Sequence, residues 1–101
     1  MEQREIKWTP RAVQERNLIL DYWYFRNKSL TYSVKLNTLF SASISLMARQ
    51  PEAGKLFNRE KSIYFILVKS YRIYFHFSEE TFVVLSIWDT RRNPVDFKEV
   101  K

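Results

Sequence analysis

The sequence predicts an α+β fold in which a helical hairpin packs on one face of a mainly antiparallel four-stranded sheet. Residues 62–88 hold three apolar runs, rich in Tyr, Phe, Ile, Val and Trp, and each is as long as one strand. The breaks between them, Lys69-Ser70 and Ser78-Glu79-Glu80, suit hairpin turns. Residues 10–50 carry apolar stripes at helical spacing, and residues 5–8 alternate as a short strand. The expected order is therefore β-α-α-β-β-β.

The composition predicts a single domain over residues 1–101. The chain is too short for two cores, and 46% hydrophobic residues with 17% aromatics argue against disorder. The absence of Cys excludes disulfides and thiolate metal sites and fits a reducing compartment. The longest apolar run, Ile63 to Val68, cannot cross a bilayer, and the opening MEQREIKW does not resemble a signal peptide. We therefore expect a cytoplasmic protein without a membrane partner.

The charge balance points to an acidic or polyanionic partner. Seventeen Lys and Arg face eleven Asp and Glu, which gives a net charge of +6. In a domain of this size such an excess attracts nucleic acid or an acidic protein to the surface.

The boundaries of the two helices follow from capping residues. Thr9 offers an N-cap oxygen and Pro10 suits the first helical position, so the first helix should run to about Arg26. Ser29 could cap a second helix that ends before Pro51. The short break between them predicts an antiparallel hairpin.

The end of the first helix carries more rings than one helical face can bury. Within the run Asp21 to Phe25, Trp23 is expected in the core, whereas Tyr24 and Phe25 are expected to contact a partner. After the hairpin, Lys55 to Lys61 is interpreted as a basic lead-in to the sheet rather than a strand. The residues after Trp88 include too few apolar side chains for another buried element.

The strand at Tyr71 to Phe77 contains the most informative residue, Arg72. Alternation places Arg72, Tyr74 and His76 on one face of the sheet. The other face is apolar and should meet the helices: Tyr71, Ile73, Phe75 and Phe77. A guanidinium, a phenol and an imidazole in a row suit phosphate binding, stacking and proton transfer. A solvated polar face is the better explanation for His76 taken alone, whereas an arginine between aromatic neighbours favours function.

Other basic residues flank this row on both sides in the sequence. They could form a phosphate-binding groove beside it, or they could be solvated loop charges: Lys55, Arg59, Lys61, Lys69, Arg91 and Arg92. The chain has no Gly-rich phosphate loop, no metal-ligand spacing and no convincing Ser-His-Asp set, so no cofactor or metal is expected.

Several segments, taken in order along the chain, form a recognisable pattern. They are IKWTPRA near the start, DYW in the first helix, P-x-x-G at Pro51 to Gly54, YRIYF at Tyr71 to Phe75, and SIWDTRRNP at Ser86 to Pro94. Together they resemble the RelE/ParE toxins of type II toxin–antitoxin systems over nearly the whole chain. The resemblance implies a small α+β toxin held inactive by an antitoxin.

Two activities are implied by this superfamily. RelE-like members cut messenger RNA on the ribosome without a metal through the ribose 2′-OH, and ParE-like members poison DNA gyrase. For RNA cleavage, Arg72 matches the strand arginine that would stabilise the phosphorane. The basic residues would bind phosphate, with Lys61 a candidate to assist the base: Lys55, Arg59, Lys61, Arg91 and Arg92.

The chain departs from the ribonuclease members after the last strand. Those members commonly place a His or Tyr there, whereas this chain has Asp89 and Thr90 and no later Tyr or His. Only Tyr74 or His76 could then act as the general acid.

Three functions therefore remain open: a ribosome-dependent endoribonuclease, a non-enzymatic gyrase poison, and an inactive relic that still binds antitoxin. The Arg-Tyr-His row favours the ribonuclease by a small margin, and the missing acid favours the gyrase poison. In each case we expect a cognate antitoxin whose acidic, disordered segment folds on the basic surface.

Overall fold

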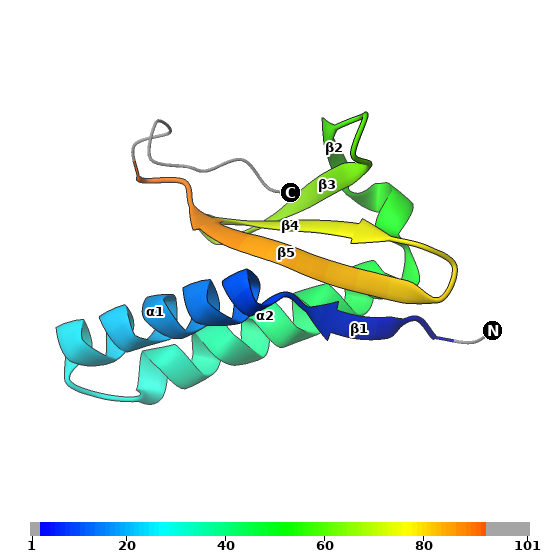
Figure 1. Cartoon of the computed structure of the whole chain (residues 1–101). Helices are drawn as coiled ribbons and strands as arrows, with labels where there is room; N and C mark the ends of the chain where they lie inside the picture. The colour runs from blue at the N-terminus through cyan, green and yellow to red at the C-terminus, as the bar shows by residue number, and fades with distance from the viewer. Residues whose placement is uncertain (1–2, 93–101) are drawn as a thin grey trace.

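The computed structural model describes residues 3–92. In chain order the elements are β1 Glu5–Trp8, α1 Pro10–Asn27, α2 Thr31–Arg49, the short 3-10 helix η1 Pro51–Ala53, β2 Lys55–Asn58, β3 Ile63–Val68, β4 Tyr71–Phe77 and β5 Thr81–Asp89. The five strands form one sheet in the order β1-β5-β4-β3-β2, with β1 parallel to β5 and the other pairs antiparallel. Both helices lie on one face of this sheet (Figure 1). The α+β class, the helical hairpin and the three-stranded meander are confirmed.

The sheet has one strand more than predicted. The stretch taken as a lead-in contains β2, which pairs Lys55 with Phe65 and Leu56 with Tyr64. Its two apolar residues explain why it joins the sheet, because the ring of Phe57 packs against Tyr74 with a centroid distance of 4.8 Å. Arg59 and Lys61 then lie in the turn between β2 and β3.

The helix starts follow local capping chemistry. The Thr9 hydroxyl accepts a hydrogen bond from the Ala12 N–H at 3.1 Å and donates to the Leu85 carbonyl at 3.0 Å, so the cap of α1 is also tied to β5. Pro10 occupies the first turn as predicted. Ser29 accepts from the Thr31 N–H, but the N-cap position of α2 belongs to Leu30. The second cap therefore lies one residue later than expected.

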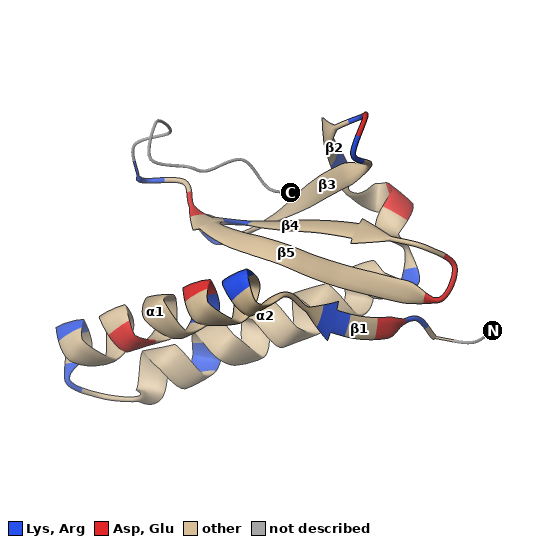
Figure 2. Ribbon diagram, viewed as in Figure 1, with Lys and Arg blue, Asp and Glu red and all other residues tan. Residues whose placement is uncertain are grey.

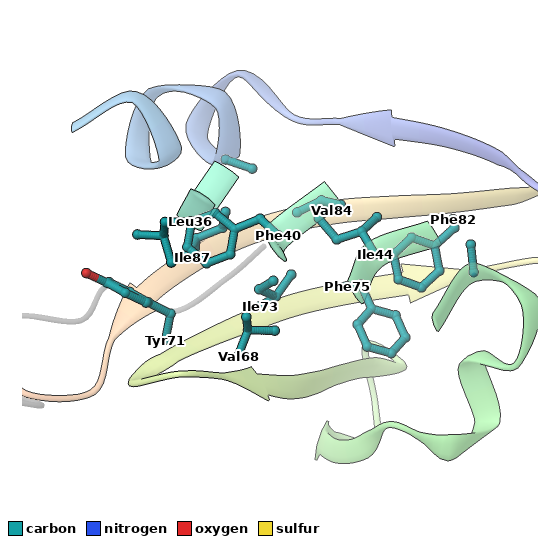
Figure 3. Packing of buried hydrophobic residues seen from close by; sticks show 12 residues of the cluster. Leu36, Phe40, Ile44, Val68, Tyr71, Ile73, Phe75, Phe82, Val84 and Ile87 are labelled. Carbon is teal, nitrogen blue, oxygen red and sulfur yellow. The ribbon is translucent and has the colours of Figure 1, made fainter. Parts of the chain in front are cut away.

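The main core lies between the hairpin and the sheet. Twelve buried residues form it, and Figure 3 shows α2 side chains meeting those of β3, β4 and β5: Ala12, Leu36, Phe40, Ile44, Ala48, Val68, Tyr71, Ile73, Phe75, Phe82, Val84 and Ile87. The predicted face of β4 is confirmed, because Phe77 also packs against this cluster. Burial of this apolar surface is the largest favourable contribution to folding.

A bulge in β5 shapes the opposite face of the sheet. Tyr74 pairs with Ser86 and Phe75 with Val84, which leaves Leu85 as an extra residue. Leu85 packs in a second cluster on the face away from the helices. Among residues 3–92, neither helix is long and apolar enough to cross a membrane.

Candidate functional site

The face of the sheet away from the helices, here called the outer face, carries a small aromatic cluster. Its buried members are Ile63, Tyr74, Leu85 and Trp88, and Phe65 and Val83 pack against them. We call these six residues the outer cluster. Every one of them comes from β3, β4 or β5. The predicted polar row therefore lies in an apolar setting rather than on an open solvated face.

Arg72 lies across this cluster. Its Nη1 donates to the Tyr74 hydroxyl at 3.5 Å, and its guanidinium carbon lies 4.4 Å from the centre of the Phe65 ring. Its register partner on β5 is Trp88. The Nε atom is buried and has no hydrogen-bond partner within residues 3–92. A cation over an aromatic face is attracted by the ring quadrupole, so the side chain is held by stacking more than by hydrogen bonds.

Tyr74 and His76 differ in their access to solvent. Tyr74 is only 2% exposed and its ring contacts Phe57 and Phe65. His76 is half-buried opposite Val83. The predicted row is thus brought onto one face as expected, with Arg72 contacting Tyr74. Their roles as catalytic groups remain predictions.

The predicted phosphate-binding cations lie on different parts of the structure and do not form one cluster. Figure 2 shows Lys and Arg spread over both helices, β1, the β2–β3 turn and the end of β5. Lys55 lies on edge strand β2, whereas Lys69 is in the β3–β4 turn at the other end of β3. Arg92 reaches the outer cluster, because its guanidinium carbon lies 4.4 Å from the centre of the Trp88 ring. Trp88 is therefore the register partner of Arg72 and the ring contact of Arg92.

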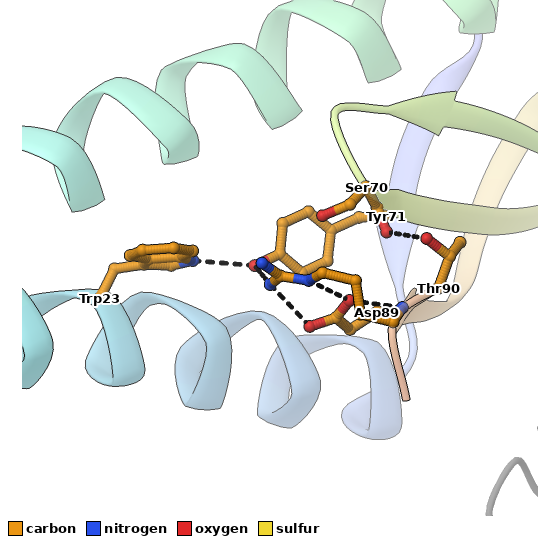
Figure 4. A network of polar contacts seen from close by, with 6 residues as sticks. Trp23, Ser70, Tyr71, Asp89 and Thr90 are labelled. Carbon is orange, nitrogen blue, oxygen red and sulfur yellow. Dashed lines mark hydrogen bonds and ion pairs between the residues drawn. The ribbon is translucent and has the colours of Figure 1, made fainter. Parts of the chain in front are cut away.

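The Arg91 guanidinium carbon lies 5.7 Å from the centre of the Trp23 ring, on the helix side of the sheet. Arg91 forms a polar clasp with Trp23, Tyr71 and Asp89, which are labelled in Figure 4. The Arg91 guanidinium donates to both Asp89 carboxylate oxygens at 2.9 and 2.8 Å and to the Tyr71 hydroxyl at 3.4 Å. The Trp23 indole N–H donates to the same hydroxyl at 2.8 Å. The clasp connects α1 to the last turn of the sheet.

Ionisation within the clasp follows from these contacts. Hydrogen bonds from Arg91 hold the pKa of the Asp89 carboxyl below its usual value. Burial raises the pKa of the Tyr71 phenol, although the Trp23 N–H acts in the opposite direction. Arg91 therefore forms an ion pair with Asp89, and its charge stabilises the end of the sheet.

Beside the clasp lies a cleft of about 440 Å³. It is lined by both apolar and charged side chains: Glu15, Leu18, Ile19, Tyr22, Tyr71, Ile87, Asp89, Arg91 and Arg92. Glu15 is held at its inner side, because its carboxylate accepts from the Ser86 hydroxyl at 2.7 Å and the Ile87 N–H at 3.2 Å. No group of three or more metal-ligating side chains occurs within residues 3–92.

The predicted partner-binding rings are exposed. Tyr24 is 41% exposed and Phe25 is 70% exposed, at the end of α1 near the tip of the hairpin. Their rings contact one another edge to face, with a centroid distance of 5.2 Å. The position of both rings is compatible with partner contact, and that role remains a prediction.

Sequence reasoning did not identify Trp88, Phe65 or Asp89 as site residues. Trp88 and Phe65 read as ordinary strand residues, and only the pairing of β3, β4 and β5 brings them beside Arg72. Asp89 could have been found, because a carboxylate two residues before an arginine at a strand end favours a local ion pair.

The comparisons with known proteins agree with this fold. The family model described as "ParE toxin of type II toxin-antitoxin system, parDE" matches residues 6–94. The chain belongs to the ParE toxin family. A solved structure described as "Chromosomal ParDE TA system from P. aeruginosa" is similar in fold, with a TM-score of 0.68 at 14% identity. The similarity covers 84% of this chain and 94% of that chain. No curated protein matches the sequence.

Proposed function

We propose that this ParE-family toxin inhibits growth by binding DNA gyrase without catalysis, and that an acidic antitoxin neutralises it. Gyrase as the target comes from the ParE side of the superfamily resemblance, which the family match favours over the RelE side. The proposal is sharper than family membership, since it excludes RNA cleavage as the cause of toxicity.

The observation that best supports a non-enzymatic role is the close packing of Tyr74 and Arg72 on the outer face. Cleavage through a ribose 2′-OH needs a proton donor within reach of the leaving oxygen. Tyr74, which contacts Arg72, is 2% exposed and packed between two aromatic rings, so a substrate has little access to its hydroxyl. Arg72 is itself stacked on Phe65. These residues suit a rigid binding surface better than a general acid.

RNA cleavage is the second candidate, favoured by one specific arrangement. Arg72 and Arg92 both border Trp88, so two cations meet an aromatic ring on one face. Two cations on one face can bind a phosphate, although Trp88 is only 7% exposed and offers little surface for a base to stack on. In that case His76 would be the remaining candidate for the proton donor.

One induction experiment separates the two candidates. The protein is expressed under tight control, RNA 5′-ends are mapped within minutes, and gyrase supercoiling and DNA cleavage are assayed with purified protein. Under the gyrase proposal, messages stay intact while gyrase-linked DNA breaks accumulate. New cuts within translated codons would contradict it and support the ribonuclease.

The arginine variant needs a matched control, because Arg72→Ala also removes a stacking contact. Arg16 is suitable, since its guanidinium carbon lies 4.9 Å from the centre of the Trp8 ring, away from the outer face. If the outer face is the toxic surface, Arg72→Ala should reduce growth inhibition about tenfold or more, and Arg16→Ala should not. Equal toxicity of Arg72→Ala and wild type would exclude the outer face for either activity.

The antitoxin part of the proposal follows from charge. A net charge of +6 attracts an acidic segment, so raising the salt concentration should slow association more than it speeds dissociation. An association rate that does not change with ionic strength would count against an acidic partner.

A further inference from the structure

Strand β1 covers less than half of the outer edge of β5. The parallel pairing ends at Trp8 opposite Val84, although β5 continues to Asp89. Thr9 then caps α1, and the chain leaves the sheet. The last residues of β5 therefore have β4 on one side and no strand on the other within residues 3–92. An uncovered strand edge presents unpaired N–H and C=O groups to an extended chain.

The Glu15 carboxylate identifies which backbone groups of this bare edge are free. It accepts a hydrogen bond from the Ile87 N–H at 3.2 Å, so Ile87 directs its backbone groups away from β4 and toward α1. Because backbone directions alternate along a strand, Asp89 points the same way, whereas Ser86 and Trp88 bond to β4. The Ile87 C=O and the Asp89 N–H have no hydrogen-bond partner within residues 3–92. One acceptor and one donor are thus available.

These two groups match one residue of a parallel strand. In a parallel pair, a residue bonds to the C=O before and to the N–H after the residue opposite it. A residue opposite Trp88 would therefore pair with both free groups. An antiparallel strand instead needs the N–H and C=O of one residue. The Ile87 N–H is already bonded to Glu15, and the Asp89 C=O accepts from the Arg92 N–H at 3.1 Å. The edge therefore favours an extended segment parallel to β5, as β1 is.

The cleft of about 440 Å³ beside the clasp provides space for such a segment. Ile87 and Asp89 line it from β5, and Leu18 and Tyr22 line it from α1. The two α1 side chains are 62% and 53% exposed, so an apolar side chain bound in the cleft would remove apolar surface of both from water. Backbone pairing and apolar contact are therefore available at the same place.

Charge at the cleft limits which protein supplies the segment. Glu15 and Asp89 line it together with Arg91 and Arg92, so two carboxylates balance two guanidinium groups. The cleft therefore offers little attraction to an acidic antitoxin, in contrast to the +6 of the whole chain. A second copy of the chain is disfavoured, because each molecule carries +6. The balance favours an uncharged, apolar segment.

Arg92 connects the cleft to the outer cluster. It lines the cleft, and its guanidinium carbon lies 4.4 Å from the centre of the Trp88 ring. The two surfaces therefore meet around the end of β5. A target protein that binds the outer face could reach the cleft without crossing another part of the chain.

We propose that an extended, uncharged segment of gyrase adds to the sheet beside the end of β5. Its residue opposite Trp88 pairs with the Ile87 C=O and the Asp89 N–H, and an apolar side chain contacts Leu18 and Tyr22. The inference rests on the proposed function for the identity of the target. It adds the docking edge, the strand direction and the chemistry of the bound segment.

The first test follows the Asp89 amide in the full chain. Hydrogen exchange is measured at single residues by mass spectrometry with electron-transfer fragmentation, on the free chain and with purified gyrase. In the free chain the Asp89 amide should exchange much faster than the Trp88 amide, which bonds to β4. With gyrase bound, exchange at Asp89 should slow about tenfold or more. Fast exchange at Asp89 while gyrase is bound and poisoned would overturn the proposed edge and leave the proposed function intact.

A matched pair of substitutions tests the apolar wall of the cleft. Leu18 and Leu30 are both 62% exposed, but Leu30 lies at the start of α2 and does not line the cleft. Leu18→Gln should weaken gyrase binding about tenfold in a titration, and inhibition of supercoiling should need a correspondingly higher toxin concentration. Leu30→Gln should change either quantity by less than about twofold. Both positions are exposed and Gln is a good helix former, so neither variant should unfold the chain.

The remaining outcomes separate this inference from the proposed function. Equal losses of gyrase binding in the two variants, or no loss from Leu18→Gln, would show that the cleft has no special part in binding and would overturn the inference. Protection of Asp89 that grows with the concentration of the chain alone would mean that a second copy fills the cleft. Protection by the cognate antitoxin in place of gyrase would overturn the inference as well. If purified gyrase is neither bound nor poisoned, the proposed function is wrong and the inference is wrong with it.

Discussion

The two faces of the sheet are packed to different extents. The face under the hairpin contributes to a core of twelve buried residues, and both helices supply side chains to it. The outer cluster has four buried residues and two partly buried ones, and all come from the sheet itself. Arginines cover part of its aromatic surface, Arg72 on Phe65 and Arg92 on Trp88.

This difference separates stability from function. The helix-covered face contains most of the buried apolar area, so substitutions there should act mainly on folding. On the outer face, cations stacked on rings provide both cover and charge, so substitutions there should change recognition at a lower cost in stability. The three predictions below test that separation, beginning with the largest effect.

The largest expected effect is the loss of a ring from the helix-covered core. Phe40 is 0% exposed and contacts Tyr71 edge to face. Phe40→Ala should lower the free energy of unfolding by about 3–5 kcal/mol, measured by urea denaturation. Phe65→Ala removes the same ring from the half-buried outer cluster and should lower it by less than half as much. Equal losses of unfolding free energy in the two variants would mean that the two faces of the sheet contribute equally to stability.

A smaller effect tests how tightly the core is closed. Gly54 has an extended backbone with φ −69°, which any residue can adopt, but a Cβ there would lie 2.6 Å from the Phe75 ring. Because Phe75 is 0% exposed, Gly54→Ala should reduce the free energy of unfolding by about 1–3 kcal/mol through overpacking.

The matched addition on the outer face is Val83→Ile, which also adds one methyl-sized group. Val83 is only partly buried, so its change should stay within about 0.5 kcal/mol. If Gly54→Ala proved harmless while Val83→Ile destabilised the chain, the outer cluster would be the more closely packed of the two.

Much of the fold could be predicted because its signals are local. The Thr9 cap, the Pro10 helix start and the polar breaks at Lys69-Ser70 and residues 78–80 depend on residues near one another in the sequence. The alternation at Tyr71 to Phe77 also fixed which side chains meet the helices. A pattern of period two contains that information in any half-covered sheet.

The candidate site could be predicted only in part, because burial on the outer face depends on pairing between distant strands. Arg72, Tyr74 and His76 were placed on one face by alternation, but the closure of Phe57 and Phe65 over Tyr74 was not visible in the sequence. Strand β2 was missed for the same reason. Its four residues carry too weak a pattern without knowledge of the edge they join.

Substitution of Asp89 in the clasp should have the smallest effect on stability, and this effect should depend on pH. Asp89 accepts two hydrogen bonds from the Arg91 side chain and one from its N–H at 2.9 Å, and these lower its pKa. A carboxyl whose pKa is lowered in the folded state stabilises the protein above its unfolded pKa, and loses this effect as the pH falls through the folded value.

Asp89→Asn should therefore be less stable than wild type by about 0.5–1 kcal/mol near pH 7, since the pair is partly exposed to solvent and screened. The difference should shrink as the pH falls below about 4. The control is Asp21→Asn, whose carboxylate makes no hydrogen bond or ion pair with residues 3–92 and should change stability by less than about 0.5 kcal/mol near pH 7. If the stability difference between Asp89→Asn and wild type were the same at pH 2, the clasp would stabilise the end of the sheet through hydrogen-bond geometry and not through the charge of Asp89.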